Sequence, residues 1–127
     1  MPHLTLHALD TDLTGHEPAL IAALTDAIVS VYGDWARPHA HVRLVGVPTG
    51  HWGIDGIPAP DPAPAITFGI RADALTRPDT PDILTRLAAA LTDATASILG
   101  EHHHPGITVD FTGRQPAHTA IGGHLTA

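Results

Sequence analysis

Two segments of the chain alternate between apolar and polar residues. Residues 3–8 read HLTLHA, and residues 66–71 read ITFGIR. A period of two places every second side chain on the same face of an extended backbone. Each segment therefore predicts a strand with one buried face.

An apolar stripe with the 3.6-residue spacing of a helix follows each strand. Thr14 and Glu17 have the spacing of a capping box, Pro18 suits a first turn, and Gly33 supplies a stop. The two stripes predict helices that end before Gly33 and Gly100, and they consist of Ile21, Leu24, Ile28 and Val31 in the first helix and Ile83, Leu87, Leu91, Ala94 and Ile98 in the second.

The second half of the chain repeats the first. LTDA at residues 24–27 returns at residues 91–94, an offset of 67, and residues 51–56 align with 118–123 in the same register. The first strands align at an offset of 62, so the second copy has 67 − 62 = 5 additional residues before its helix. Closing strands follow each helix, beginning near Val42 and Ile107.

Each copy is therefore expected to form a β-α-β unit whose two strands are parallel. The predicted fold class is α+β, with tandem β-α-β repeats forming a four-stranded mixed sheet and both helices on one face. We expect a single domain over residues 1–127, with repeat one at about 2–57, a linker at about 58–63 and repeat two at about 64–127. The sheet face without helices is expected to be half apolar and available to another subunit.

The formal charge is −7, cysteine is absent, and all six basic residues are arginines. The acidic balance and the lack of a basic block argue against nucleic acid or an anionic membrane as a partner. No apolar run reaches the roughly 18 residues of a membrane span, and a cytoplasmic location is expected. An arginine held in a pocket of an acidic protein suits a carboxylate ligand, because its guanidinium can bind both oxygens.

The first copy resembles 4-oxalocrotonate tautomerase. The resemblance rests on Pro2 directly after Met1, on HVRL at residues 41–44, and on GHWGIDG at residues 50–56. The second copy covers the rest, so the chain is similar to the fused members of the tautomerase superfamily and, in length, to macrophage migration inhibitory factor. The resemblance implies a homotrimer and a small-molecule acid as substrate, with no cofactor.

It also implies that Pro2 is the catalytic residue of an isomerase, a keto–enol tautomerase. A free α-amine titrates near about 8, and burial at an apolar pocket lowers that pKa, so the amine becomes a base at neutral pH. Removal of Met1 is required. A retained Met1 would instead favour a non-enzymatic trimer.

Relatives bind the substrate carboxylate with arginines. The arginine that ends the first strand in the unfused enzyme is replaced here by Asp12, so the second copy is expected to supply the anchors, Arg71 at its strand end and Arg77 in the five-residue insert. Arg43 and Asp110 occupy the same register in the two closing strands. The resemblance places Asp110 at the substrate and Arg43 in a degenerate pocket near Pro64.

Two further features have competing interpretations. Trp52 either walls the pocket, as an aromatic residue does in relatives, or packs at an interface. The run of histidines at residues 102–104, and His39 with His41, lack cysteines and a third spaced partner, so no metal site is expected. Asp110 also keeps open a decarboxylase or hydratase of the same superfamily as an alternative activity.

Overall fold

The computed structural model describes residues 2–126, and its centre is one four-stranded sheet. The strands are β1 (His3–Leu9), β2 (His41–Val47), β5 (Ala65–Arg71) and β6 (Thr108–Arg114), in the order β2-β1-β5-β6. β1 is parallel to β2, β5 is parallel to β6, and β1 and β5 are antiparallel. The predicted mixed sheet of two β-α-β units is confirmed.

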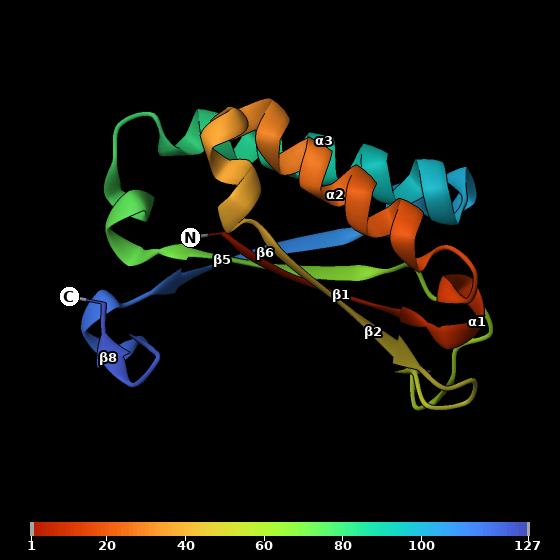
Figure 1. The fold of residues 1–127 in the computed structure, drawn as a ribbon. Coiled ribbons are helices and arrows are strands. Elements are labelled where there is room, and N and C mark those ends of the chain that lie inside the picture. Colours follow the sequence, from red (N-terminus) through yellow and green to blue (C-terminus); the bar gives the residue numbers. More distant parts are fainter. Residues whose placement is uncertain (1, 127) are drawn as a thin grey trace.

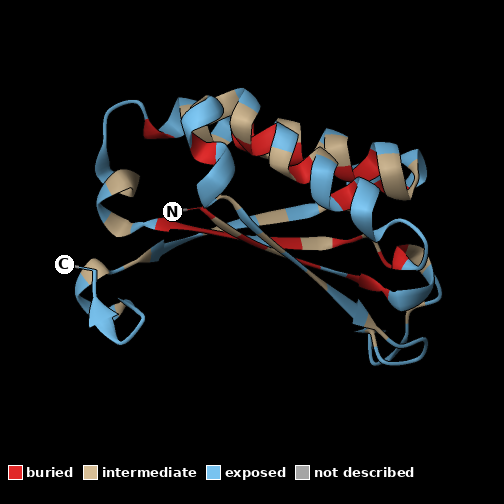
Figure 2. Ribbon diagram, in the orientation of Figure 1, coloured by how far each residue is buried: buried red, intermediate tan, exposed pale blue. Residues whose placement is uncertain are grey.

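Two long helices, α2 (Glu17–Tyr32) and α3 (Thr80–Leu99), lie side by side across one face of the sheet (Figure 1). The buried residues line the contact between these helices and the strands (Figure 2). Leu24, Phe68 and Leu87 are fully buried there, and burying one such side chain contributes about 1.5–3 kcal/mol. The other face of the sheet has no helix over it, as predicted.

The start of α2 differs from the predicted capping box. A short helix, α1 (Asp10–Leu13), precedes it, and the Thr14 hydroxyl donates a hydrogen bond to the Asp10 carbonyl instead of capping α2. The Glu17 carboxylate accepts from the Gly15 amide. The first position of the apolar stripe also differs, because Leu20 is fully buried whereas Ile21 is 42% exposed; Leu24 and Ile28 are fully buried as predicted.

Short elements complete each copy. Two 3-10 helices, η1 (Asp34–His39) and η3 (Glu101–Gly106), lead from the long helices into β2 and β6. The five additional residues of the second copy fall around η2 (Ala72–Thr76) and the turn after it. A two-stranded hairpin follows each closing strand. After β2, strand β3 (Gly53–Ile54) pairs with β4 (Ile57–Pro58). After β6 and the 3-10 helix η4 (Pro116–His118), strand β7 (Ala120–Ile121) pairs with β8 (His124–Leu125).

An approximate two-fold axis relates the two copies and passes between β1 and β5. Thr5 pairs with Thr67 across the antiparallel β1–β5 contact, and these two residues are also equivalents at the offset of 62. Pro2 and Pro64 consequently lie at opposite ends of the sheet. The Pro2 carbonyl accepts a hydrogen bond from the His41 amide at 3.1 Å, and the Pro64 carbonyl accepts the equivalent bond from Thr108 at 3.3 Å.

The helix-free face is more polar than the sequence led us to expect, since β1 presents His3, Thr5 and His7 there. The hairpins carry four of the large exposed apolar side chains, namely Ile54, Ile57, Ile121 and Leu125; the others in the described part of the chain are Ile21 on α2, Trp35 on η1 and Val45 on β2. None of the helices in residues 2–126 combines the length and the apolar character needed to cross a membrane.

Candidate active site

A cationic pocket of about 360 Å³ opens on the helix-free face of the sheet, at the end where Pro2 lies. The C-terminal segment, residues 116–126, forms one wall. The N-terminus and this segment lie at the same end of the molecule (Figure 1). The charged and titratable residues in the lining are Arg43, Arg71, Arg114, His3 and His41. Half of the six arginines of an acidic chain thus line one pocket.

The strand register brings these side chains together. His3 pairs with His41 across β1 and β2, and Arg71 pairs with Arg114 across β5 and β6. Gly69, which pairs with His3, lies beneath the side chain of Arg114. A Cβ atom at position 69 would lie 3.2 Å from Cδ of Arg114, so glycine leaves room for that arginine over the strand.

Among the residues that line the pocket, His3 has the largest pKa shift. Burial, as the largest cause, and the positive charges of Arg114, His41 and Arg43 together lower its pKa from 6.5 to about 4. Its ring stacks on His41, with the centroids 4.9 Å apart. His3 is therefore a neutral imidazole at pH 7, able to accept or donate a hydrogen bond.

Arg71 has a partner in η2. Its Nε lies 3.3 Å from Oδ1 of Asp73, and this hydrogen bond holds the pKa of the Asp73 carboxyl below its usual value. Both side chains are more than half exposed. Within residues 2–126, Arg43 and Arg114 form no ion pair, so their guanidinium groups can bind an anion.

Of the residues predicted for the site, Arg71 and Arg43 line the pocket, and Pro2 is buried directly beside His3. Arg77 instead borders a separate cavity of about 30 Å³ next to α3. Asp110 is exposed on β6, four residues before Arg114, and does not reach the pocket within one chain.

Two further residues, Trp52 and Arg114, bear on the sequence interpretation. Trp52 is half-buried just before β3, where its carbonyl accepts a hydrogen bond from the Ala59 amide, and it does not line the pocket of its own chain. Arg114 was missed, although it has the same parity on β6 as Asp110. That parity was the available signal, because both side chains had to lie on the helix-free face.

The arrangement is suited to binding a small organic acid. Guanidinium groups bind carboxylates through paired hydrogen bonds, and a volume of this size is typical of small-molecule sites. Among the described residues, the lining contains no aspartate or glutamate. A carboxylate would therefore enter a site whose fixed charges are positive.

Solved structures of known proteins share this fold. Native fused 4-OT is similar to the chain at 26% sequence identity and a TM-score of 0.81, covering 98% of this chain and 95% of that chain. The F6 fused 4-OT asymmetric trimer also has a TM-score of 0.81, at 22% identity and with the same coverage. Pt0534 inactivated by 2-oxo-3-pentynoate has a TM-score of 0.73 at 19% identity, covering 98% of this chain and 96% of that chain.

No protein-family model and no curated protein matches the sequence. The structural similarity nevertheless extends over nearly the whole of both chains, including both repeats. The chain thus has the fold of the fused 4-OT proteins, and the resemblance to the tautomerase superfamily is confirmed.

Proposed function

We propose that the chain is a cofactor-independent isomerase, a keto–enol tautomerase that uses Pro2 as general base on an enol or 2-oxo acid. In this proposal Met1, which lies outside the described residues, is removed and the Pro2 nitrogen becomes a free secondary amine. The observation that carries the proposal is the cationic pocket lined by His3, the residue that follows Pro2, although the buried Pro2 is not itself one of the lining residues. It would hold the carboxylate of such an acid close to the amine.

The proposed reaction moves one proton. Pro2 takes the proton of the enol hydroxyl, the O–H electron pair becomes part of the carbonyl, and the electron pair of the C=C bond accepts the proton back from Pro2 at carbon. Substrate and product are isomers, so the step needs no oxidant, reductant or second substrate. Arg71 and Arg114 would stabilise the negative charge that develops during the transfer.

The remaining predicted residues have proposed roles in an assembly. The exposed apolar hairpins and the trimers formed by fused 4-OT support a homotrimer. In a trimer, Asp110, Trp52 and Arg77 would contribute to a pocket only across a subunit boundary, because none of them reaches the pocket of its own chain.

A hydratase is the second candidate, and the neutral imidazole of His3 favours it. Hydration requires a group that binds and orients the attacking water, and the neutral His3 ring in the pocket lining can accept a hydrogen bond from it, although a pKa of about 4 makes His3 a weak base. Incubation of a candidate unsaturated acid in ¹⁸O-labelled water distinguishes the two reactions. A hydratase would add labelled oxygen at carbon and raise the product mass by one water, whereas a tautomerase forms an isomer.

The isomerase proposal is tested on the purified full chain with phenylenolpyruvate. Intact mass should show that Met1 is absent, and Pro2→Ala should reduce kcat by about 10²–10⁴-fold, the usual range for a lost general base. A primary amine remains in that variant, so residual activity is expected. 2-Oxo-3-pentynoate, which inactivated Pt0534, should label the Pro2 nitrogen of the parent chain.

The matched control keeps the proline ring and removes only its basicity. Insertion of one glycine between Met1 and Pro2 acylates the Pro2 nitrogen, so the variant should be inactive and should resist labelling at Pro2. Full activity of this variant on phenylenolpyruvate would exclude Pro2 as the base.

A further inference from the structure

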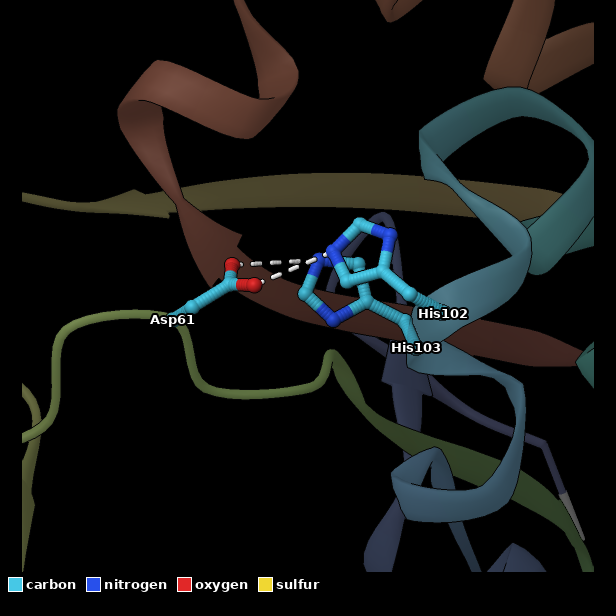
Figure 3. Close-up of side chains that lie close together, drawn as sticks. All are labelled: Asp61, His102 and His103. Atoms are coloured by element: carbon cyan, nitrogen blue, oxygen red, sulfur yellow. Dashed lines mark hydrogen bonds and ion pairs between the residues drawn. The ribbon is translucent and has the colours of Figure 1, made fainter.

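A cluster of histidine and aspartate side chains lies at the opposite end of the sheet from the cationic pocket. Figure 3 shows Asp61, His102 and His103 directed toward one another, with Asp61 on the linker and both histidines on η3. Each offers one ligand atom, and these three atoms lie within 4.8 Å of one another. The sequence interpretation lacked a third partner for the histidines, and the linker supplies it.

His103 has an unusual environment for a histidine. Its side chain is only 2% exposed, and Nε2 lies 3.2 Å from Oδ2 of Asp12. The two atoms do not align as a hydrogen bond, so both are buried without a hydrogen-bond partner among the described residues. A buried polar atom of this kind destabilises the folded chain unless something binds it.

The spacing of the ligand atoms suits a tetrahedral metal ion. Bonds of about 2.0–2.1 Å from zinc to nitrogen or oxygen give tetrahedral edges of about 3.3 Å between ligand atoms. The observed separations are 3.0 Å from His102 Nε2 to Asp61 Oδ2 and 3.5 Å from His103 Nε2 to Asp61 Oδ1, so each histidine lies close to this ideal distance from one oxygen of Asp61. Asp12 Oδ2 lies 3.2 Å from His103 Nε2, but Asp12 is not among the three residues whose ligand atoms all lie within 4.8 Å of one another.

The two imidazoles also face the same point although they are neighbours in sequence. Successive side chains on a 3-10 helix point about 120° apart, so adjacent residues normally diverge. Here the rings of His102 and His103 are 4.0 Å apart between centroids. Two protonated rings at this distance would repel each other, whereas two neutral rings can both donate a lone pair to one cation.

We propose that Asp61, His102 and His103 form a site for a divalent transition-metal ion of the Zn²⁺ class, with Asp12 beside the buried histidine. Two imidazole nitrogens and one carboxylate oxygen are ligands that suit zinc, and a zinc site with three protein ligands leaves a fourth position for water. Asp61 comes from the linker and both histidines come from the second repeat, while Asp12 comes from α1 of the first repeat. The ion would therefore join the linker to the second repeat, independently of the proposed catalysis at Pro2.

The test is metal titration of the tag-free full chain after treatment with a chelator. Co²⁺ is the spectroscopic probe, because a tetrahedral Co²⁺ site absorbs visible light far more strongly than an octahedral one. We expect one equivalent of Co²⁺ per chain with a tetrahedral spectrum, and displacement by one equivalent of Zn²⁺. Zn²⁺ should also raise Tm, because it binds the folded chain only.

Exposed ligands are the variants of choice, since they can be changed without opening the core. His102→Ala and Asp61→Asn should each abolish the tetrahedral spectrum and the rise in Tm, and Asp12→Asn should weaken Zn²⁺ binding by about tenfold or more. The matched control is His104→Ala, which removes the neighbouring histidine. That histidine pairs with Asp93 at 2.8 Å, outside the cluster, so metal binding should be unchanged.

Three results would overturn the proposal. They are the absence of stoichiometric Co²⁺ or Zn²⁺ binding, binding that survives in His102→Ala and Asp61→Asn, and binding lost equally in His104→Ala. The first would leave the pairing of His103 with the carboxylates of Asp12 and Asp61 as the account of the cluster. The other two would assign the metal to other histidines of the chain.

Discussion

The guanidinium group of Arg71 binds the carboxylate of Asp73, with Nε 3.3 Å from Oδ1 and Nη2 3.5 Å from Oδ2. Asp73 thus occupies the paired donors that a substrate carboxylate would use. Both side chains are more than half exposed, and exposed pairs contribute only about 0–1 kcal/mol, so an incoming acid can displace Asp73. The pair holds Arg71 in place without closing the pocket.

Replacing Asp73 tests this competition. Asp73→Asn removes the internal carboxylate, so KM for an acid substrate should fall while kcat changes little. The measurement is steady-state kinetics on phenylenolpyruvate at low ionic strength. Asp82→Asn is the control, because Asp82 pairs with Arg86 on the exposed side of α3. An unchanged KM in Asp73→Asn, or the same fall in both variants, would show that Asp73 does not compete with substrate.

A second prediction ranks the arginines. Arg71→Ala and Arg114→Ala should each reduce kcat/KM by an amount equivalent to about 1.5–3 kcal/mol, the usual contribution of hydrogen bonds to a charged group. Arg71→Lys should recover only part of the loss, because an ammonium group cannot bind both carboxylate oxygens. Arg77→Ala is expected to be milder, since Arg77 borders a different cavity. Equal damage from Arg77→Ala would mean that a neighbouring subunit brings it to the substrate.

The pH dependence of stability should report on His3. Its pKa is about 4 in the folded chain and 6.5 in the unfolded chain, so the unfolded chain binds a proton first as the pH falls. The free energy of unfolding should therefore be highest above about pH 6.5, should decrease between about pH 6.5 and 4, and should then level off. Chemical denaturation of the parent and of His3→Gln across this range measures the effect.

The difference between the two chains isolates His3 from the other titrating groups. His3→Gln should flatten the decrease, and identical slopes for both chains would contradict the low pKa. A bound carboxylate should also raise the pKa of His3, because it offsets the charge of Arg114. NMR titration of the His3 ring with and without an acid ligand measures that shift.

A fourth prediction concerns assembly. If the hairpins are subunit contacts, Leu125→Asp should break up the trimer, because Leu125 is 62% exposed in the single chain and an aspartate buried in an interface lacks a partner. Light scattering should give three times the 13.2 kDa chain mass for the parent and a lower mass for the variant. Ile21→Asp, on the exposed side of α2, should leave the mass unchanged. A parent that is monomeric at all concentrations would contradict the trimer.

The periodicity of the apolar residues predicted the strands, the helices and their arrangement, because each of these elements must bury one face. Leu4 and Leu6, or Ile66 and Phe68, can be buried together only if the backbone is extended with the same face toward the helices. The start of α2 was predicted less well. Thr14 had an alternative acceptor in the Asp10 carbonyl, and that choice depends on α1, which has no periodic signal of its own.

The site was predictable in part, for a related reason. Pro2, Arg43 and Arg71 were accessible through repeat alignment and resemblance, but the pairing of Arg114 with Arg71 depends on the register of β5 against β6. The cluster at His103 was harder still. Asp12 and Asp61 are far from His103 in sequence, and only the folded chain brings them close to this histidine.

The antiparallel pairing of Thr5 with Thr67 makes the two ends of the sheet structurally equivalent. Only one of these ends holds the N-terminal proline, because the equivalent Pro64 lies within the chain. If Pro2 is the base, as proposed, the two ends must differ in chemistry, because the nitrogen of Pro64 is part of an amide bond and has no basicity. Ala36 near Pro2 is a small buried residue, whereas its equivalent near Pro64, at the offset of 67, is His103, the buried imidazole between two carboxylates.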